Sequence, residues 1–243
     1  MTRQIAVLLT NNDDAAFAQA FPNDGQKVSH LLRALRPGWG FSVVPVMNGV
    51  LPVNLNAYDG YVITGSPASV NDHDLPWVQA LLRFIQQLHE ARRPAIGLCF
   101  GHQAMAKALG GEVARHPGGW GLGTGMTHWH QPQAWMTPAA ASTCLLAAHN
   151  EQVTRMPADA VCLGGSDFCP IGSMQIGDHM WTTQFHPEMS PQFMQALLDH
   201  LGDQLDVSTL SRARESLTPR PLDSEHFAQW MVQFLESRFE STP

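Results

Sequence analysis

Apolar residues near the amino terminus follow two different spacings, and these spacings alternate along the chain. Residues 4–9 form an almost unbroken apolar run of strand length, which is typical of a parallel strand covered on both faces. Apolar side chains then recur at helical spacing over residues 25–35, which predicts an amphipathic helix that ends before Pro37. A second strand is expected over residues 41–46. Strand, helix and strand in this order indicate an α/β fold with right-handed crossovers.

The same alternation continues through the middle of the chain. Apolar runs predict further strands at residues 59–64, 95–98, 126–130, 171–176 and 180–185. One helix is expected over residues 75–91, and another directly after the strand at 95–98, ended by Gly110 and Gly111. Loops at the carboxyl ends of parallel strands usually carry the site of such a fold, so we expect the functional residues there.

The carboxyl-terminal part of the chain is predicted to be helical. Helices are expected over residues 190–201, 211–216 and 225–238, with Thr218–Pro221 separating the last two. Five apolar residues share one face of the last helix: Phe227, Trp230, Met231, Phe234 and Leu235. An apolar helical stripe is ordinarily core, so we expect it to pack on the body of the protein. Contact with a second copy of the chain, giving a homodimer, or with another partner is the alternative.

Composition narrows the classes of function. Of 243 residues, 44% are hydrophobic and 14% are charged, and the net charge is −7. A lightly charged, acidic surface argues against nucleic-acid binding, which needs a basic stripe. Four cysteines without C-x-x-C spacing favour a reducing compartment, and the amino terminus shows neither a leader peptide nor an apolar segment of membrane length. A cytoplasmic protein without membrane association is therefore expected.

The segment with the clearest chemistry surrounds Cys99. Gly97 and Gly101 flank this cysteine in Gly-Leu-Cys-Phe-Gly, between the strand at 95–98 and the helix that follows it. This is the cysteine form of the G-x-S-x-G elbow, in which a nucleophile sits on a strained strand-to-helix turn and the glycines permit close backbone approach. The partial positive charge at the helix amino terminus favours the reactive thiolate. Alone, the motif is equally compatible with simple packing at a strand–helix junction.

A second motif lies far downstream, after the strand-like run that leads to it. In Gln-Phe-His-Pro-Glu, His186 precedes Glu188 by two residues. A histidine can accept a thiol proton while a carboxylate fixes its tautomer, so Cys99, His186 and Glu188 form a candidate nucleophile, base and orienting group. They occur in the order nucleophile then base, which α/β enzymes with an elbow commonly show.

Two clusters could suggest a metal, and we expect neither to bind one. Asp72, His73 and Asp74 precede the predicted helix at 75–91, and this cluster is expected to cap it. His128 and His130 would share one face of a strand, but no third ligand is near them in the sequence. No metal and no cofactor is therefore expected.

Together the motifs GLCFGHQ, ALGG and QFHPE resemble the class I (triad) glutamine amidotransferases. The resemblance covers roughly residues 5–200 and is strongest to stand-alone domains similar to the amidotransferase half of GMP synthase; plant γ-glutamyl peptidases share the pattern. It implies a flavodoxin-like three-layer sandwich with a mostly parallel central sheet. It also implies an amidotransferase domain at residues 1–203 and a helical extension at residues 204–243.

The same resemblance implies further site residues. The oxyanion hole would use the backbone N–H groups of Ser66 and Phe100, although the family usually has a glycine where Ser66 stands. The glutamine-like substrate would contact Gly65, Gln103, Gly121, Asn150 and Glu151. Glu151 replaces the usual aspartate of the family segment, which shifts the acceptor by one methylene.

Three functions remain open from the sequence. The first is hydrolysis of the γ-amide of glutamine through a cysteinyl thioester, giving glutamate and ammonia, with a separate synthase subunit as the ammonia acceptor. The second is a free-standing γ-glutamyl hydrolase or peptidase acting on a γ-glutamyl small molecule. The third, of another class, is a binding or regulatory protein that has lost catalysis.

Overall fold

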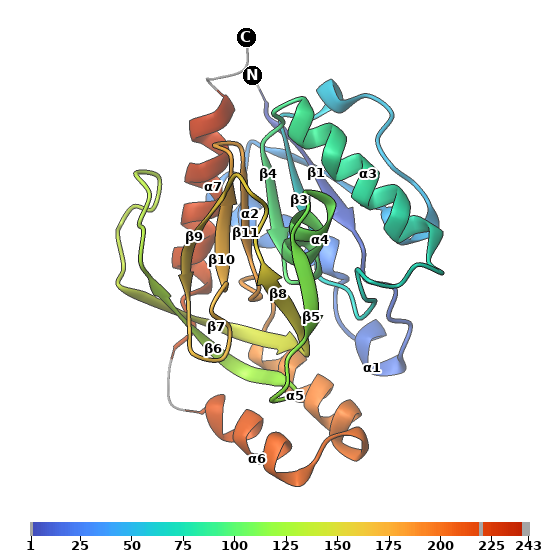
Figure 1. Ribbon diagram of the computed structural model, residues 1–243, viewed down its shortest axis with the longest axis vertical. Helices are drawn as coiled ribbons and strands as arrows, with labels where there is room; N and C mark the ends of the chain where they lie inside the picture. The colour runs from blue at the N-terminus through green and yellow to red at the C-terminus, as the bar shows by residue number, and fades with distance from the viewer. Residues whose placement is uncertain (1, 219–220, 240–243) are drawn as a thin grey trace.

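The computed structural model describes residues 2–218 and 221–239 (Figure 1). The strands are β1 Gln4–Leu9, β2 Gly40–Pro45, β3 Gly60–Ile63, β4 Ala95–Leu98, β5 Glu112–Arg115, β6 Gly121–Trp129, β7 Ser142–His149, β8 Glu151–Arg155, β9 Ala160–Gly165, β10 Ser173–Ile176 and β11 Met180–Thr183. The α-helices are α1 Ala16–Gln19, α2 Asp24–Leu35, α3 Pro76–Glu90, α4 Phe100–Ala108, α5 Pro191–Leu201, α6 Val207–Ser216 and α7 Ser224–Phe239.

One large sheet organises the described part of the chain. Its strand order is β2-β1-β3-β4-β11-β10-β9-β6-β7, and β5 and β8 form a separate pair. The five strands from β2 to β11 run parallel, whereas the pairings from β11 to β7 are antiparallel. The expected α/β architecture is confirmed, with an antiparallel extension on one side of the parallel half.

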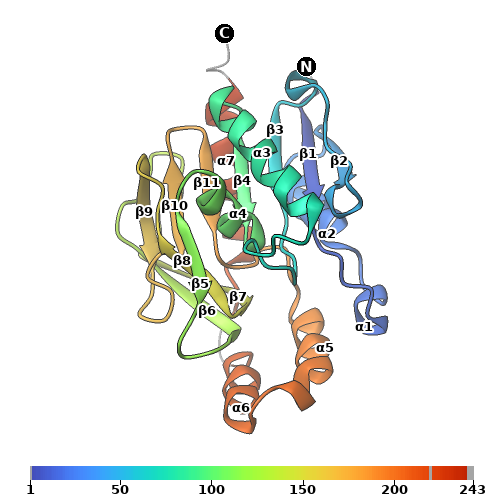
Figure 2. The same cartoon turned by 45° about the vertical axis from the view of Figure 1, so that its right-hand side comes forward.

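Helices cover both faces of the parallel half (Figures 1 and 2). Alternation along β1 shows the three layers, because Ala6 and Leu8 pack in the core under α3 and α4, whereas Ile5 and Val7 pack in the core under α2 and α7. A strand points successive side chains to opposite faces, so an apolar run such as β1 needs cover on both sides. The structure provides that cover, as the sequence pattern predicts.

Most predicted boundaries agree with the structure to within a residue or two. The helix α4 ends before Gly110, whose φ of +92° is the left-handed conformation expected of a glycine stop. The strands β5, β7, β8 and β9 were not predicted from the sequence, and β6 begins five residues before the strand expected at residues 126–130. The helix α6 begins four residues earlier than expected because Asp206 caps it, its carboxylate accepting a bond from the Thr209 N–H.

The expected caps of α3 are absent. The residue at its N-cap is Leu75, without a capping side chain, and Pro76 occupies the first turn. Asp72 instead accepts a hydrogen bond from the backbone N–H of Asp74 at 2.9 Å, within the loop. The prediction that these carboxylates cap the helix was therefore wrong, because a proline at the first position leaves one amide fewer to satisfy.

The helix α7 packs inside the protein. Its aromatic residues Phe227, Trp230 and Phe234 are fully buried, in a cluster that includes Trp181 and Trp129 from the sheet. The expectation that this stripe packs on the body is confirmed over residues 224–239, and the separator at Thr218–Pro221 lies partly outside the described residues. The division between an amidotransferase domain and an extension at residue 203 stays a prediction. Both helices beyond it, α6 and α7, contact the main sheet.

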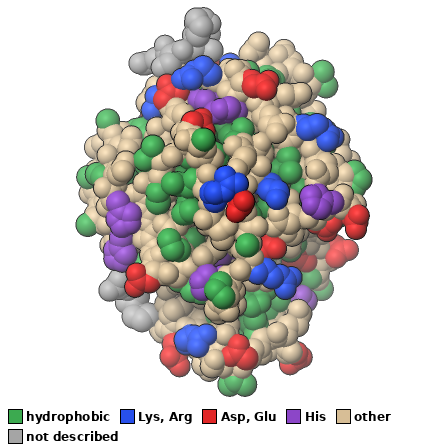
Figure 3. All heavy atoms as spheres, in the orientation of Figure 1, with side chains coloured by type: hydrophobic (Ala, Val, Ile, Leu, Met, Phe, Trp, Pro, Cys, Tyr) green, Lys and Arg blue, Asp and Glu red, His purple; other side chains and the backbone are tan. Residues whose placement is uncertain are grey.

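The charged surface is mixed. On the face in Figure 3, lysine and arginine side chains are dispersed among acidic and histidine side chains. Within the described residues, none of the helices combines the length and the apolar character needed to cross a membrane.

Replacement of Trp230 by alanine tests whether α7 is part of the core. The indole is fully buried and its N–H donates to the Pro138 carbonyl at 2.9 Å. We expect Trp230→Ala to lower the free energy of unfolding by about 3–5 kcal/mol in urea denaturation, the usual cost of removing a buried aromatic. Gln229→Ala, at an exposed neighbouring position, is the control and should change stability little. A variant with unchanged stability but altered oligomeric state would contradict the packing role.

Candidate active site

The turn at Cys99 is held by close backbone packing. Cys99 joins β4 to α4 with φ +50° and ψ −101°, an unusual conformation for a residue with a side chain. A Cβ on Gly97 would lie 2.6 Å from the Gly101 carbonyl oxygen, and one on Gly101 would lie 2.5 Å from the carbonyl oxygen of Ile63. Both glycines therefore serve the close approach predicted for them, and the surrounding backbone holds the cysteine in its strained conformation.

Strand register brings three distant segments to this turn. In the parallel sheet Leu98 is the partner of Thr183, so Gln184 lies beside Cys99 where both strands end. On the other side β3 is aligned with β4, which brings Gly65 close: a Cβ on Gly65 would be 3.7 Å from the Cβ of Cys99. These strands end at the same edge because they are parallel and adjacent.

His186 and Glu188 lie at the same edge, both almost completely buried. The Nδ1 of His186 lies 2.8 Å from the Oε1 of Glu188, and the His186 backbone N–H donates to the Leu146 carbonyl on β7. The carboxylate acceptor places the proton on Nδ1 and leaves Nε2 as an acceptor, and this buried nitrogen has no hydrogen-bond partner among the described residues. In its neutral form the ring is therefore the tautomer that can receive a thiol proton.

Electrostatics favour a protonated His186 in this pocket. Burial opposes the charged ring, but the negative charge of the Cys99 thiolate and the Glu188 carboxylate, both beside the imidazole, outweighs it and holds the pKa of His186 well above its ordinary value. The nearby His102 behaves differently, since burial and then the neighbouring His149 lower its pKa to about 3. Its Nδ1 lies 2.7 Å from the Thr182 hydroxyl, on β11.

Gly65 is required for the position of the imidazole. A Cβ at residue 65 would lie 2.8 Å from the Cε1 of His186, a contact that side chains do not make. Ser66, the next residue, has no positive φ: among described non-glycine residues only Arg92 and Cys99 do. The departure from the family glycine at position 66 therefore causes no backbone strain.

Gln184 contacts the thiol, and the sequence analysis gave it no role. Its amide nitrogen lies 3.6 Å from the Cys99 sulfur, while its amide oxygen accepts from Gln103 at 3.2 Å. Gln103 also donates to the carbonyl oxygen of Glu151 at 2.6 Å, so its amide orientation is fixed and fixes that of Gln184. Gln184 could have been identified from the sequence, because it precedes Phe185 and His186 directly. Pairing of the two strands places it next to the predicted nucleophile.

A cavity of about 210 Å³ opens on one side of Cys99. It is lined by Gln103, Asn150 and Glu151, which the sequence predicted, and by Arg115, which it did not. Arg115 and Glu151 are directly paired across β5 and β8, and Glu151 accepts the Ser69 hydroxyl at 2.7 Å. The sequence alone does not identify Arg115 as a site residue, because its place in the site depends on its pairing with Glu151.

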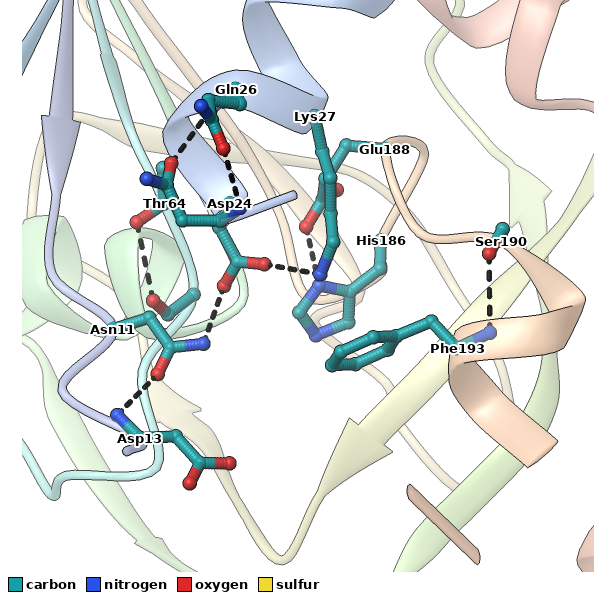
Figure 4. A network of polar contacts seen from close by, with 12 residues as sticks. Asn11, Asp13, Asp24, Gln26, Lys27, Thr64, His186, Glu188, Ser190 and Phe193 are labelled. Carbon is teal, nitrogen blue, oxygen red and sulfur yellow. Dashed lines mark hydrogen bonds and ion pairs between the residues drawn. The ribbon is translucent and has the colours of Figure 1, made fainter. Parts of the chain in front are cut away.

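A second cavity, of about 280 Å³, opens on the other side of Cys99. Gly65, Ser66 and His186 line it, together with residues of α5 and of the loop before α1. Trp120 lines both cavities and was also missed by the sequence analysis. Figure 4 shows the polar network beside this cavity, in which Asp24 binds the side chains of Asn11 and Lys27.

Two expected residues lie elsewhere or contribute differently. Gly121 lines neither cavity; it packs behind them, where a Cβ would collide with the rings of Phe168 and His149. The Phe100 side chain is buried against Trp77, and its backbone N–H is the first of α4, which has no acceptor within the helix. Among the described residues, no group of three or more His, Cys, Asp or Glu side chains could hold a metal ion.

Comparison with known proteins bears on the family and the fold of the chain. A family model described as glutamine amidotransferase class-I matches residues 25–200. A glutamine amidotransferase from Thermotoga maritima, known from its crystal structure, aligns over all of both chains with a TM-score of 0.75 and 16% identity. At that identity the likeness shows the fold alone.

Two curated relatives match parts of the chain. γ-Glutamyl peptidase 3 of Arabidopsis thaliana is 28% identical over 164 residues, which cover 64% of this chain and 66% of the plant protein. A GMP synthase (glutamine-hydrolyzing) from Vibrio parahaemolyticus is 30% identical over 137 residues, which cover 54% of this chain and 24% of the synthase. The chain thus matches less than two thirds of the length of either relative.

Removal of the Glu188 charge tests the electrostatics of the imidazole. The carboxylate stabilises the protonated ring, so we expect Glu188→Gln to lower the pKa of His186 in an NMR titration of its imidazole. Glu112→Gln is the matched control, because Glu112 is exposed and paired with Arg155 at the far end of β5. An unchanged pKa in Glu188→Gln would contradict the pairing.

Proposed function

The chain belongs to the class-I glutamine amidotransferase family, and from this premise we propose that it cleaves the γ-amide bond of glutamine or of a related γ-glutamyl amide through a thioester on Cys99. The observation that carries the proposal is the position of Cys99 at the meeting point of two cavities, with the His186–Glu188 pair beside it. A substrate whose scissile bond lies at the sulfur would place one portion in each cavity.

In the first half of the reaction the thiol becomes an acyl carrier. His186 takes the proton of Cys99, and the sulfur attacks the γ-carbonyl carbon to give a tetrahedral oxyanion. Glu188 keeps the imidazole oriented and stabilises its charged form. When the intermediate collapses, the C–N bond breaks and His186 gives its proton to the departing nitrogen, so that an amine or ammonia leaves and a γ-glutamyl thioester remains.

The oxyanion would be held by the backbone N–H groups of Ser66 and Phe100. Phe100 offers the first amide of α4, whose helix dipole also favours negative charge at this end. Such donors contribute about 3–4 kcal/mol each to acyl-transfer transition states. A backbone donor does not depend on its side chain, so serine at position 66 is compatible with the role.

In the second half water replaces the sulfur. His186 accepts a proton from the water as the oxygen attacks the thioester carbon, and the thiol is regenerated as glutamate leaves. Gln184 donates to the sulfur in the resting enzyme, so it would stabilise the thiolate whenever that form is present.

The amino-acid end of the substrate fits the smaller cavity. A glutamyl group carries an α-ammonium and an α-carboxylate, and this cavity presents a carboxylate at Glu151 and a guanidinium at Arg115. No ion pair joins these two side chains within the described part of the chain, so each charge is available to a zwitterion. We assign Glu151 to the α-ammonium and Arg115 to the α-carboxylate.

A second candidate function is supply of ammonia to a separate synthase subunit. The similarity to the GMP synthase from Vibrio parahaemolyticus, 30% identical over 137 residues, supports this candidate, because the name of that protein states that it hydrolyses glutamine. Full turnover of γ-glutamyl amides by the purified chain alone would favour the hydrolase; turnover that appears only when a synthase is added would favour the amidotransferase.

Replacement of Cys99 tests the proposed chemistry. We expect Cys99→Ala to reduce hydrolysis of glutamine and γ-glutamyl amides by about 10⁴-fold or more, as removal of a nucleophile does in other acyl-transfer enzymes. Cys162→Ala is the control, because Cys162 is a free thiol on β9 outside both cavities. Mass spectrometry of wild-type protein quenched in acid should show one added glutamyl group on Cys99. Wild-type protein with neither turnover nor labelling by a glutamine-analogue electrophile would instead support a binding role.

Replacement of Arg115 tests the orientation of the glutamyl group. We expect Arg115→Ala to raise KM for glutamine by about tenfold, the range of a charge-assisted hydrogen bond, with a smaller change in kcat. Arg155→Ala, on the partner strand β8 and outside both cavities, should leave KM unchanged. If both variants raise KM equally, the arginine at position 115 supports the hairpin and does not bind the substrate.

A further inference from the structure

The larger cavity beside Cys99 has no role in the recognition of the glutamyl group. It shares Cys99, Ser66, Pro67, Trp120 and Ala148 with the smaller cavity, so the two are continuous at the sulfur. The residues that recognise charge in the smaller one, Arg115 and Glu151, are absent from the lining of the larger one. A substrate with its glutamyl group in the smaller cavity therefore directs its other portion into the larger one.

The position of the imidazole also indicates that the leaving portion of the substrate lies in the larger cavity. His186 lines the larger cavity and is absent from the lining of the smaller one. The group that protonates a departing nitrogen must lie within hydrogen-bond reach of it, so the scissile nitrogen faces the larger cavity. This step rests on the proposed function, because it takes His186 as the proton donor.

The size and lining of the larger cavity exceed what ammonia requires. Its volume is about 280 Å³, whereas a molecule of the size of water or ammonia occupies roughly 30 Å³. Apolar side chains form much of its wall: Trp120, Met189, Phe193, Leu197 and Leu201. An aliphatic chain of several carbons fits this space and this chemistry.

The charge in this cavity comes mainly from Asp13. The neighbouring Asp24 is already satisfied, since it pairs with Lys27 at 2.8 Å and accepts from Asn11 at 2.7 Å, and the Lys27 ammonium lies over the Phe193 ring. Asp13 has no cationic partner among the described residues; one oxygen accepts the Ala15 N–H, and Figure 4 shows its carboxylate turned away from Asn11. His200, also in the lining, stacks on Phe17.

We propose that the larger cavity binds the amine portion of a γ-glutamyl amide, and that this amine has an aliphatic chain ending in a cationic group. The chain lies along the α5 wall, between Trp120 and Leu197, and the cation lies at Asp13. Glutamine is then the smallest substrate of the site. The larger cavity recognises the amine that leaves after His186 has protonated its nitrogen.

A series of synthetic amides tests the proposal in purified wild-type protein. γ-Glutamyl ethyl-, propyl-, butyl- and pentylamide have leaving groups of similar basicity, so differences among them report binding of the chain. We expect kcat/KM to rise about two- to fourfold for each added methylene until the cavity is filled. The 4-aminobutylamide should exceed the pentylamide about threefold or more, and the 3-carboxypropylamide about tenfold or more.

Two variants assign the preference to the cavity. Asp13→Asn keeps the oxygen that accepts the Ala15 N–H and should bring the ratio of kcat/KM for the 4-aminobutylamide and the pentylamide to about one. Asp14→Asn, an exposed neighbour outside the lining, is the matched control and should keep the wild-type ratio. Leu197→Trp, which fills the cavity from α5, should remove the advantage of pentylamide over ethylamide.

The outcomes separate this proposal from the function on which it rests. Hydrolysis of glutamine with a flat alkyl series and no charge preference would overturn the cavity assignment and leave the proposed function standing. Preference for the 3-carboxypropylamide would overturn the cationic end. No turnover of glutamine or of any amide would overturn both.

Discussion

The site depends on one tight contact between backbones, where the turn that carries Cys99 packs on the end of β3. Gly97 and Gly101 leave no room for a side chain, because the Gly101 and Ile63 carbonyl groups occupy the space. Cys99, between these two glycines, has φ +50°. The strain at this residue is balanced by packing elsewhere in the sheet, and the sulfur is held at the sheet edge as a result.

From that point the parallel register distributes the remaining groups. β3 contributes Gly65 on one side of the sulfur, and β11 contributes Gln184 and His186 on the other. Each is close to Cys99 because it follows the end of a strand next to β4. The absence of a side chain at Gly65 then lets the His186 ring approach, since a Cβ there would lie 2.8 Å from its Cε1.

The two cavities beside the Cys99 sulfur differ in the polarity and charge of the side chains that line them. Among the described residues, the smaller cavity presents an arginine and a glutamate that form no ion pair, which suits an amino-acid head group, and the larger one is mainly apolar with one acid, Asp13, that has no cationic partner. Part of the wall of the larger cavity is formed by α5, which follows the His186 loop and packs in a cluster with Leu122 and Leu146, with the Lys27 ammonium over the Phe193 ring. The helix that ends the family match therefore shapes the side from which a leaving group would depart.

The sequence alone determined the α/β alternation, the elbow and the chemistry of its cysteine, because apolar periodicity and glycine spacing are local properties of the chain. It also indicated that α7 packs inside, from the aromatic stripe at 227–235. Only the tertiary structure decided which polar residues meet. Arg115 and Gln184 reach the site through strand pairing, and Asp13 lies in the loop between β1 and α1, which lines the larger cavity. Such pairings depend on contacts between segments far apart in the chain, and neither composition nor spacing within one segment encodes them.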